Sequence, residues 1–162
     1  MEKQVLDPCC GCKMFWFDKN DNRVVFSDVR KGNFDVSQYK KNVGKKEIDP
    51  DVIQDFRSLD FEDNTFWHII FDPPHVKSLS LNSVIGFSYG TLDKDTWKED
   101  LRKGFAECFR VLKPNGTLIF KWNEIQIPLK EVLALTDYKP LYGHRSGKSS
   151  KTHWVAFIKT SE

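Results

Sequence analysis

Residues 66–75 read FWHIIFDPPH and are the clearest structural signal in the chain. Its first half is almost continuously apolar, which predicts a strand over residues 65–71 that is buried on both faces. An acid, two prolines and a histidine follow. Proline fixes φ and lacks a backbone N–H, so the strand must end at Asp72. Two interpretations follow: the proline pair only ends a strand, or the acid belongs to a functional site.

The same pattern of an apolar strand that ends in an acid occurs three more times. Predicted strands over residues 3–8, 23–30 and 51–56 end near Asp7, Asp28 and Asp55. Ligands of α/β sheets bind at the carboxyl ends of the strands. We therefore predict that these three acids and Asp72 share one ligand site.

The remaining pattern alternates helices with strands. Apolar residues on one face predict a helix over residues 93–112, which Pro114 and Gly116 end. Two strands a short loop apart, 139–145 and 153–159, predict an antiparallel hairpin. The order indicates an α/β sandwich around a mostly parallel sheet with one antiparallel edge. The other predicted elements are a short helix (12–19), a loop or weak helix (31–50), a strand (117–122) and a helix (127–137).

Composition restricts the class of protein. Of 162 residues, 40% are hydrophobic and 14% aromatic, which excludes a disordered chain. No apolar run reaches the roughly 18–20 residues that a membrane helix requires, and the N-terminus has no signal-peptide layout. Three of the four cysteines lie within residues 9–12, unlike a secreted disulfide framework. We expect a reduced, cytoplasmic protein without a membrane segment.

At these residues the chain resembles the class I S-adenosylmethionine-dependent methyltransferases. It is most similar to the amino-methyltransferases of nucleic acids, which carry an Asp-Pro-Pro-aromatic motif. The segments that carry the resemblance are LDPCCGC (6–12), FSDVR (26–30), residues 53–75, CFRVLKPNGTLIFKW (108–122) and THWVAFIK (152–159). The resemblance implies a Rossmann-like three-layer sandwich with a seven-stranded sheet. It also implies that residues 1–162 form one catalytic domain without a separate target-recognition domain.

The resemblance assigns roles in S-adenosylmethionine binding. The loop after the first strand would wrap the methionine part of the cofactor, Asp28 would accept both ribose hydroxyls, and Asp55 and Phe56 would meet the adenine. The family carries two or more glycines in that loop, whereas this chain has only Gly11, between two cysteines. Residues of the loop with these implied contacts are Asp7, Pro8, Cys9, Cys10 and Gly11.

The Asp-Pro-Pro-His motif carries the implied catalytic role. Asp72, which also borders the cofactor, and the Pro73 carbonyl would accept the two N–H bonds of a target amine and turn its lone pair toward the methyl group. Pro73 and Pro74 stiffen the turn. His75 takes the place of the family's Tyr, Phe or Trp and can stack on the target base.

Substrate contacts are less determined. Trp122 and Asn123 follow a predicted strand and serve either packing or base contact. The basic loop, residues 143–151 with Arg145, Lys148 and Lys151, is either a solvated turn or a clamp for phosphates. The polar segment 78–97 predicts a lid on the substrate side. The spacing of Cys9, Cys10 and Cys12 does not match a zinc site, so no metal is predicted.

The function that follows is S-adenosylmethionine-dependent N-methylation of adenine N6 or cytosine N4 in DNA or RNA. Methylation of guanine in RNA or of a protein glutamine stays open, because the same motif serves those amines. A binding module that has lost catalysis is a further alternative. Since the catalytic core uses the whole chain, a partner subunit or a homo-oligomer could supply substrate recognition.

Overall fold

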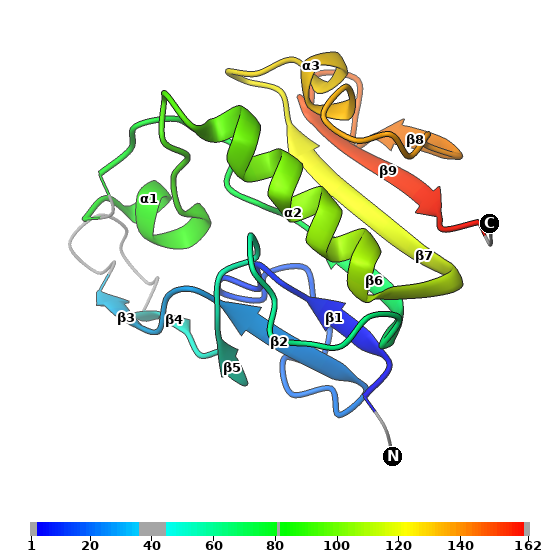
Figure 1. The fold of residues 1–162 in the computed structure, drawn as a ribbon. Coiled ribbons are helices and arrows are strands. Elements are labelled where there is room, and N and C mark those ends of the chain that lie inside the picture. Colours follow the sequence, from blue (N-terminus) through cyan, green and yellow to red (C-terminus); the bar gives the residue numbers. More distant parts are fainter. Residues whose placement is uncertain (1–2, 36–44, 81, 161–162) are drawn as a thin grey trace.

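The computed structural model of this protein describes residues 3–35, 45–80 and 82–160. Its main sheet has seven strands in the order β5-β2-β1-β6-β7-β9-β8 (Figure 1). The first five in this order are parallel, and β9 runs antiparallel to both β7 and β8. The predicted fold class is confirmed. The strands are β1 (Val5–Asp7), β2 (Val24–Asp28), β5 (Val52–Ile53), β6 (Phe66–Phe71), β7 (Leu112–Asn123), β8 (Tyr142–Arg145) and β9 (Thr152–Ile158).

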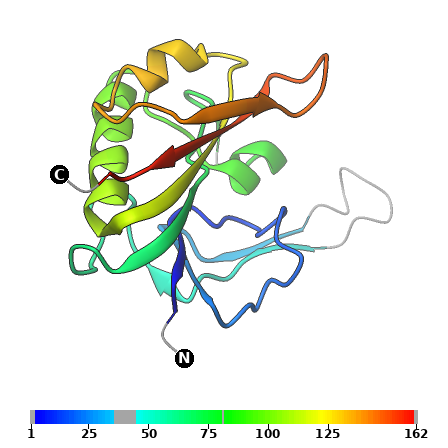
Figure 2. The same ribbon diagram turned by 90° about the vertical axis from the view of Figure 1, so that its right-hand side faces the viewer.

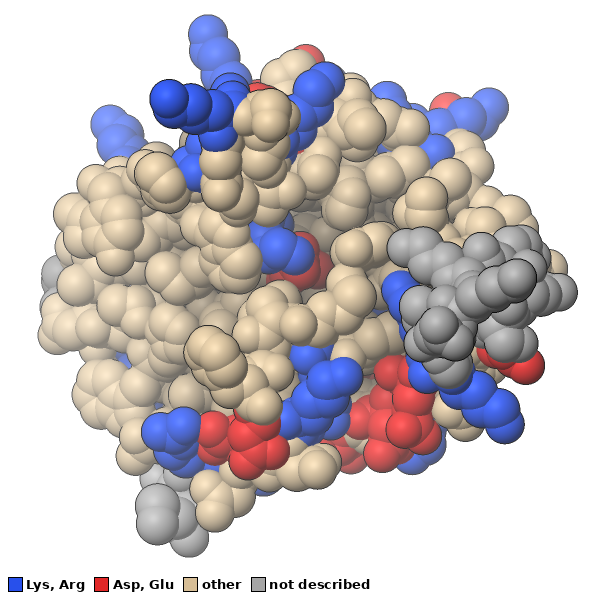
Figure 3. Space-filling model, turned by 180° about the vertical axis from the view of Figure 1, so that it is seen from behind, with Lys and Arg blue, Asp and Glu red and all other residues tan. Residues whose placement is uncertain are grey.

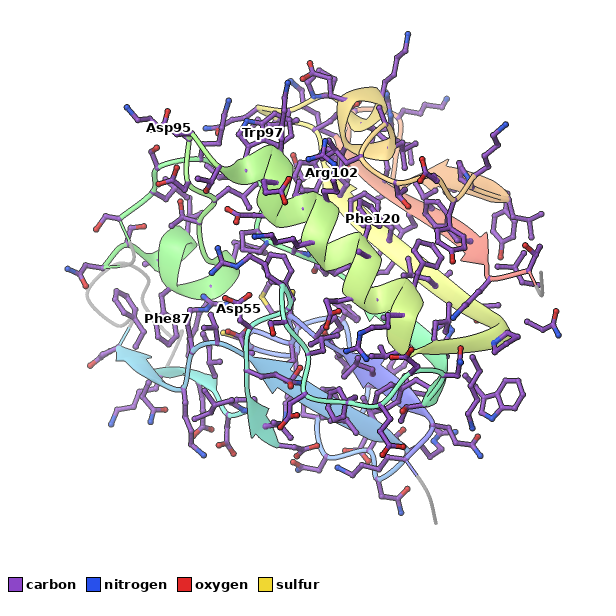
Figure 4. All side chains as sticks on the ribbon, viewed as in Figure 1. Asp55, Phe87, Asp95, Trp97, Arg102 and Phe120 are labelled. Carbon is purple, nitrogen blue, oxygen red and sulfur yellow. The ribbon has the colours of Figure 1, made fainter. Side chains whose placement is uncertain are left out.

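The core lies between the sheet and helix α2 (Trp97–Val111), which crosses β6 and β7 in Figure 1. The helix forms because its apolar residues recur on one face, as the sequence predicts. Phe105 from that face contacts Phe71 of β6 and Phe120 of β7, with ring centroids 5.3 and 4.9 Å apart. Figure 4 shows Phe120 beneath the helix. The buried helix anchors β6, and therefore the residues that follow it.

Two short helices complete the described part of the chain. Helix α1 (Val84–Tyr89) lies within the predicted lid segment, and its N-terminus is capped by the Ser83 side chain, which accepts a hydrogen bond from the Gly86 N–H. It lies beyond the carboxyl ends of the parallel strands in Figure 1. Helix α3 (Leu129–Leu133) is shorter than the predicted helix over 127–137.

The predicted helix over residues 12–19 is wrong, because these residues form turns. Lys13 has a positive φ of 52°, which a helix does not allow. Trp16 donates a hydrogen bond from Nε1 to Asp7 Oδ2 and packs edge-on against Phe26 of β2. These contacts hold the segment against the sheet face opposite α2. In Figure 2, α2 lies to the left of the sheet and this segment to its right. Contacts with the sheet therefore override the local helical pattern.

The segment 31–50 was predicted as loop or weak helix and instead contains a strand pair. β3 (Gly32–Asp35) pairs antiparallel with β4 (Lys45–Ile48). Residues 36–44 of the predicted segment lie outside the described residues. The predicted strand over 51–56 is reduced to the two residues of β5. No helix among the described residues is long and apolar enough to cross a membrane.

Candidate active site

The four acids predicted to share a site do lie along the same edge of the sheet. Asp7 and Asp28 are the last residues of β1 and β2, and Asp72 follows the last residue of β6. Since β1 pairs with β2 on one side and with β6 on the other, all in parallel, these carboxylates meet at one edge. Asp55, two residues beyond β5, extends the row.

Two adjoining cavities follow this row. The first is lined by residues 8–12, Asp28, Phe56, Asp72, Pro73 and Tyr89, among others. The second reaches Asp55. Both are lined by Val29, Arg30, Phe56 and Pro74, so they form one continuous cleft at the carboxyl edge.

Asp7 supports the loop after β1 from below. Its carboxylate is fully buried and accepts hydrogen bonds from the Cys9 N–H at 3.2 Å and from Trp16 Nε1 at 2.8 Å. Burial raises the pKa of Asp7 to about 7, although the Trp16 bond opposes the rise. Asp7 therefore holds the loop in place, while the loop itself lines the cleft.

Gly11 lets this loop approach helix α1 closely. Its φ is +48°, and a Cβ there would lie 3.1 Å from the Ser88 carbonyl oxygen. The other positive φ in this loop falls on Lys13, and Cys10 and Cys12 keep negative values. The departure from a glycine-rich loop is therefore compatible with closure, because the left-handed positions avoid the cysteines.

Asp28 is buried and forms an ion pair with Arg30. Its carboxylate accepts hydrogen bonds from the Gly11 N–H at 2.9 Å and from the Arg30 guanidinium at 2.9 and 3.1 Å. Arg30 also donates to the Phe87 carbonyl of α1 at 2.5 Å. Any diol that binds Asp28 must therefore share it with Arg30 or displace the guanidinium.

Asp55 and Phe56 lie at the other end of the cleft. Asp55 is paired with Arg57, whose guanidinium also reaches Asp100 of α2 at 2.9 Å. The Arg57 hydrogen bonds lower the pKa of Asp55. Phe56 packs against Phe71 and exposes one side to both cavities. In Figure 4, Asp55 lies near the carboxyl end of β2, between that strand and the helices.

Asp72 makes a single close ion pair. Lys121 Nζ lies 2.6 Å from Asp72 Oδ2, and the two side chains are only 19% and 15% exposed. Burial raises the pKa of Asp72, whereas Lys121 lowers it. No protein hydrogen bond to Oδ1 occurs within the described residues, and Asp72 lines the cleft. One carboxylate oxygen is therefore available to a ligand.

His75 is held between aromatic rings and is neutral. Tyr89 and Trp122 meet the imidazole edge-on, with centroids 5.5 and 6.2 Å away. Burial, and next the Lys121 charge, lower the pKa of His75 to about 4. The ring is therefore uncharged at neutral pH.

The structure does not bring Trp122 and Asn123 into the cleft. Trp122 is fully buried and donates from Nε1 to the Ile127 carbonyl at 2.9 Å. The Asn123 side chain donates a hydrogen bond to Thr152 Oγ1 and accepts one from the Ile125 N–H. Of the two alternatives for these residues, packing is the role seen here. Burial follows because β7 alternates, which directs Trp122 to the same face as Phe120.

The basic loop, residues 143–151, includes the end of β8 and connects this strand to β9. Arg145 is paired with Glu124 at 3.2 Å, and Lys148 and Lys151 are exposed. Figure 3, which views the molecule from behind, shows basic side chains gathered along the upper edge of a largely uncharged face. The loop thus presents cations to solvent beside this face.

The clustered cysteines are not arranged as metal ligands. Burial raises the pKa values of Cys9, Cys10 and Cys12. Within the described ranges, no group of three or more His, Cys, Asp or Glu side chains could hold a metal ion. Protonated thiols at these positions fill space in the loop.

Two charged residues of the site, Arg30 and Lys121, were not predicted from the sequence. Each nevertheless stands in a sequence pattern that could have indicated its role. The pattern Asp-x-Arg occurs at residues 21–23, 28–30 and 55–57, and each arginine pairs with its acid. Lys121 interrupts the apolar run of residues 118–122, and an ammonium that is largely buried needs a partner.

Comparisons with known proteins identify the fold. No protein-family model and no curated protein sequence matches the chain. Among solved structures, the PH0226 protein of Pyrococcus horikoshii aligns with a TM-score of 0.57 and 18% identity, over 99% of this chain and 83% of its own. A SAM-dependent methyltransferase of Methanosarcina mazei aligns with a TM-score of 0.52 and 14% identity, over 100% and 95% of the two chains.

A third structure was determined with ligands. It is 1,6-didemethyltoxoflavin-N1-methyltransferase of Burkholderia thailandensis, with bound 1,6-didemethyltoxoflavin and S-adenosylhomocysteine. It aligns with a TM-score of 0.52 and 15% identity, over 97% of this chain and 71% of its own. At such identities the likeness concerns the fold alone. The chain has the Rossmann-like fold of the SAM-dependent methyltransferases.

Proposed function

We propose that this protein is an S-adenosylmethionine-dependent N-methyltransferase that acts on an exocyclic amine of nucleic acid, adenine N6 or cytosine N4. The observation that carries the proposal is the position of Asp72, Pro73 and Pro74, which line the same cleft as the loop after β1. His75, the last residue of the motif, lies beside Tyr89, which also lines that cleft. The descriptions of the similar structures name no nucleic acid, so the substrate class rests on this motif.

The residues of the cleft fit the proposed cofactor. Loop residues 8–12 would hold its methionine part, Asp28 its ribose, and Asp55 with Phe56 its adenine. Gly11 supports this fit, because a side chain there would crowd the Ser88 carbonyl and push the loop away from α1. When bound, S-adenosylmethionine supplies a methyl group already activated by its sulfonium.

The chain's own contribution is to orient the amine. Asp72 Oδ1 and the Pro73 carbonyl are two acceptors for its two N–H bonds, and proline stiffens their turn. With both N–H bonds engaged, the nitrogen lone pair points away from the ring of the base. After transfer, Oδ1 is the acceptor placed to take the excess proton. The neutral His75 would stack on the base.

The proposal is tested with labelled cofactor. The protein is incubated with methyl-labelled S-adenosylmethionine and separately with RNA, single-stranded DNA, duplex DNA or a protein extract, and the products are digested and identified by mass spectrometry. N6-methyladenine or N4-methylcytosine supports the proposal. Label in guanine or glutamine alone would contradict the assigned substrate, and absence of cofactor binding in calorimetry would favour a binding module.

Asp28→Ala should weaken cofactor binding about tenfold. Charge-assisted hydrogen bonds contribute roughly 1.5–3 kcal/mol, but Arg30 already occupies Asp28, so the lower value applies. Calorimetry with S-adenosylmethionine measures the change. The control is Asp60→Ala, an exposed acid outside the cleft, which should bind as the wild type does. Equal affinity of Asp28→Ala and wild type would remove Asp28 from the site.

We propose further that the basic loop binds phosphates. Replacing Arg145, Lys148 and Lys151 with Gln should flatten the salt dependence of nucleic-acid binding, by about 0.7–0.9 in the log–log slope for each lost contact. Arg145 can contact a phosphate only after its ion pair with Glu124 breaks, so Lys148 and Lys151 should account for most of the change in slope. Gln at Lys94, Lys98 and Lys103, exposed near or on α2, is the matched control. A slope no flatter than that of the control would assign the loop as a solvated turn.

A further inference from the structure

Lys121 lies on the face of β7 that points away from α2. Leu118, Phe120 and Trp122 alternate with it and are fully buried on the α2 face. Its ammonium lies 5.3 Å from the ring centroid of Phe15 and 5.6 Å from that of Trp154. Figure 3 views this side of the sheet, where basic and acidic atoms lie together in a hollow of a largely uncharged surface. Aromatic faces stabilise a cation that has lost most of its water.

The ion pair with Asp72 is an inefficient way to stabilise a fold. Two charges that leave water lose hydration energy, which their mutual attraction barely offsets. Two apolar side chains of similar volume would serve stability equally well at this place. The ion pair is therefore better explained by a role in the chemistry of Asp72 than by a role in packing.

We propose that Lys121 is the positioning residue of the methyl-transfer site: it holds Asp72 Oδ2, keeps that carboxylate ionised, and leaves Oδ1 as acceptor for the target amine. The inference rests on the proposed function and extends it to a residue outside the Asp-Pro-Pro-His motif. Lys121 acts on the amine only through Asp72.

The charges around Asp72 explain why it needs a cation. The Asp72 charge contributes to raising the pKa of Asp7 on β1, and the neighbouring Cys9 thiol is protonated. Burial raises the pKa of Asp72 itself, and Lys121 on β7 opposes this rise. A proton on Oδ1 would turn this oxygen into a hydrogen-bond donor, so it could no longer accept from the target amine. The same ammonium helps to keep His75 neutral.

The test compares Lys121→Met with Lys121→Arg. Methionine keeps the length of the side chain and removes its charge, whereas arginine keeps the charge. Single-turnover methyl transfer at saturating cofactor is measured between pH 5 and 9. The pKa of Asp72 rises without the cation, so activity in the methionine variant should be lost at low pH and recover at high pH. We expect its acid limb to move up by about 1–3 pH units and the arginine variant to stay near wild type.

A second readout needs no substrate. The ionisation of Asp72 is followed by carbon-13 NMR of its carboxyl group in wild type and Lys121→Met, and it should shift in the same direction. If no nucleic acid is methylated but this titration shifts, the proposed function fails while the inference about the ion pair holds. The inference would be overturned if, in Lys121→Met, both the titration of Asp72 and the acid limb of the pH–activity profile were the same as in wild type. An equal loss of activity at every pH would also overturn it, because this indicates a role in folding only.

Discussion

Asp72→Ala should abolish methyl transfer while S-adenosylmethionine still binds. The variant removes the acceptor that would orient the amine, and loss of one preorganised group of this kind costs about 10²–10³-fold in rate. Asp28, Asp55 and the loop after β1 are unchanged, so the cofactor should retain its affinity within a few-fold. Methyl transfer to nucleic acid and calorimetry with the cofactor measure the two effects separately.

Stability needs its own control in this experiment. Asp72→Ala leaves the Lys121 ammonium buried beside Phe15 and Trp154 without its anion, which destabilises the fold. Asp72→Asn keeps the volume and one carbonyl acceptor, and Asp137→Ala, an exposed acid, reports on substitution in general. Thermal unfolding identifies variants that fold. A folded, fully active Asp72→Ala would exclude the catalytic interpretation.

His75→Ala should cost the enzyme about 1–3 kcal/mol in affinity for the target base, up to roughly a hundredfold or more, because base stacking contributes that much. His75→Tyr should keep or raise activity, since the phenol ring stacks more extensively than imidazole. Binding of a short oligonucleotide and methyl transfer are measured for both variants.

The two His75 variants separate stacking from hydrogen bonding. If a ring nitrogen of His75 recognises the target, the tyrosine variant should fail as badly as alanine. Because burial keeps the imidazole neutral, neither activity nor base affinity should show a titration of His75 between pH 5 and 8. Equal failure of both variants would reject stacking and indicate polar recognition by the imidazole.

Most of the fold could be predicted from local pattern. Strand β6 is a continuous apolar run that ends at proline, and α2 is a face of recurring apolar residues. Both features are properties of neighbouring residues, so they can be recognised without the rest of the chain. The prediction failed at residues 12–19, where the favourable bond is between Trp16 and Asp7, nine positions away.

The carboxyl row of the candidate site was also predictable in outline. A parallel sheet aligns the ends of its strands, so acids that follow successive strands must come together. Alternation along the strand puts Trp122 on the same face as Phe120, but its burial depends on which segments cover that face, and Trp122 Nε1 donates to the Ile127 carbonyl.

Local sequence pattern was sufficient to predict which carboxylates gather at the carboxyl edge of the sheet, because apolar runs and prolines act within a few residues. Only the tertiary structure decided what those carboxylates contact. Asp72 and Lys121 are 49 positions apart and meet because β6 pairs with β7 in a register that aligns Phe71 with Phe120. Pairing brings the next residue of each strand, Asp72 and Lys121, to the same edge. Because both side chains are largely buried there, water is scarce and each charged group takes the other as its partner.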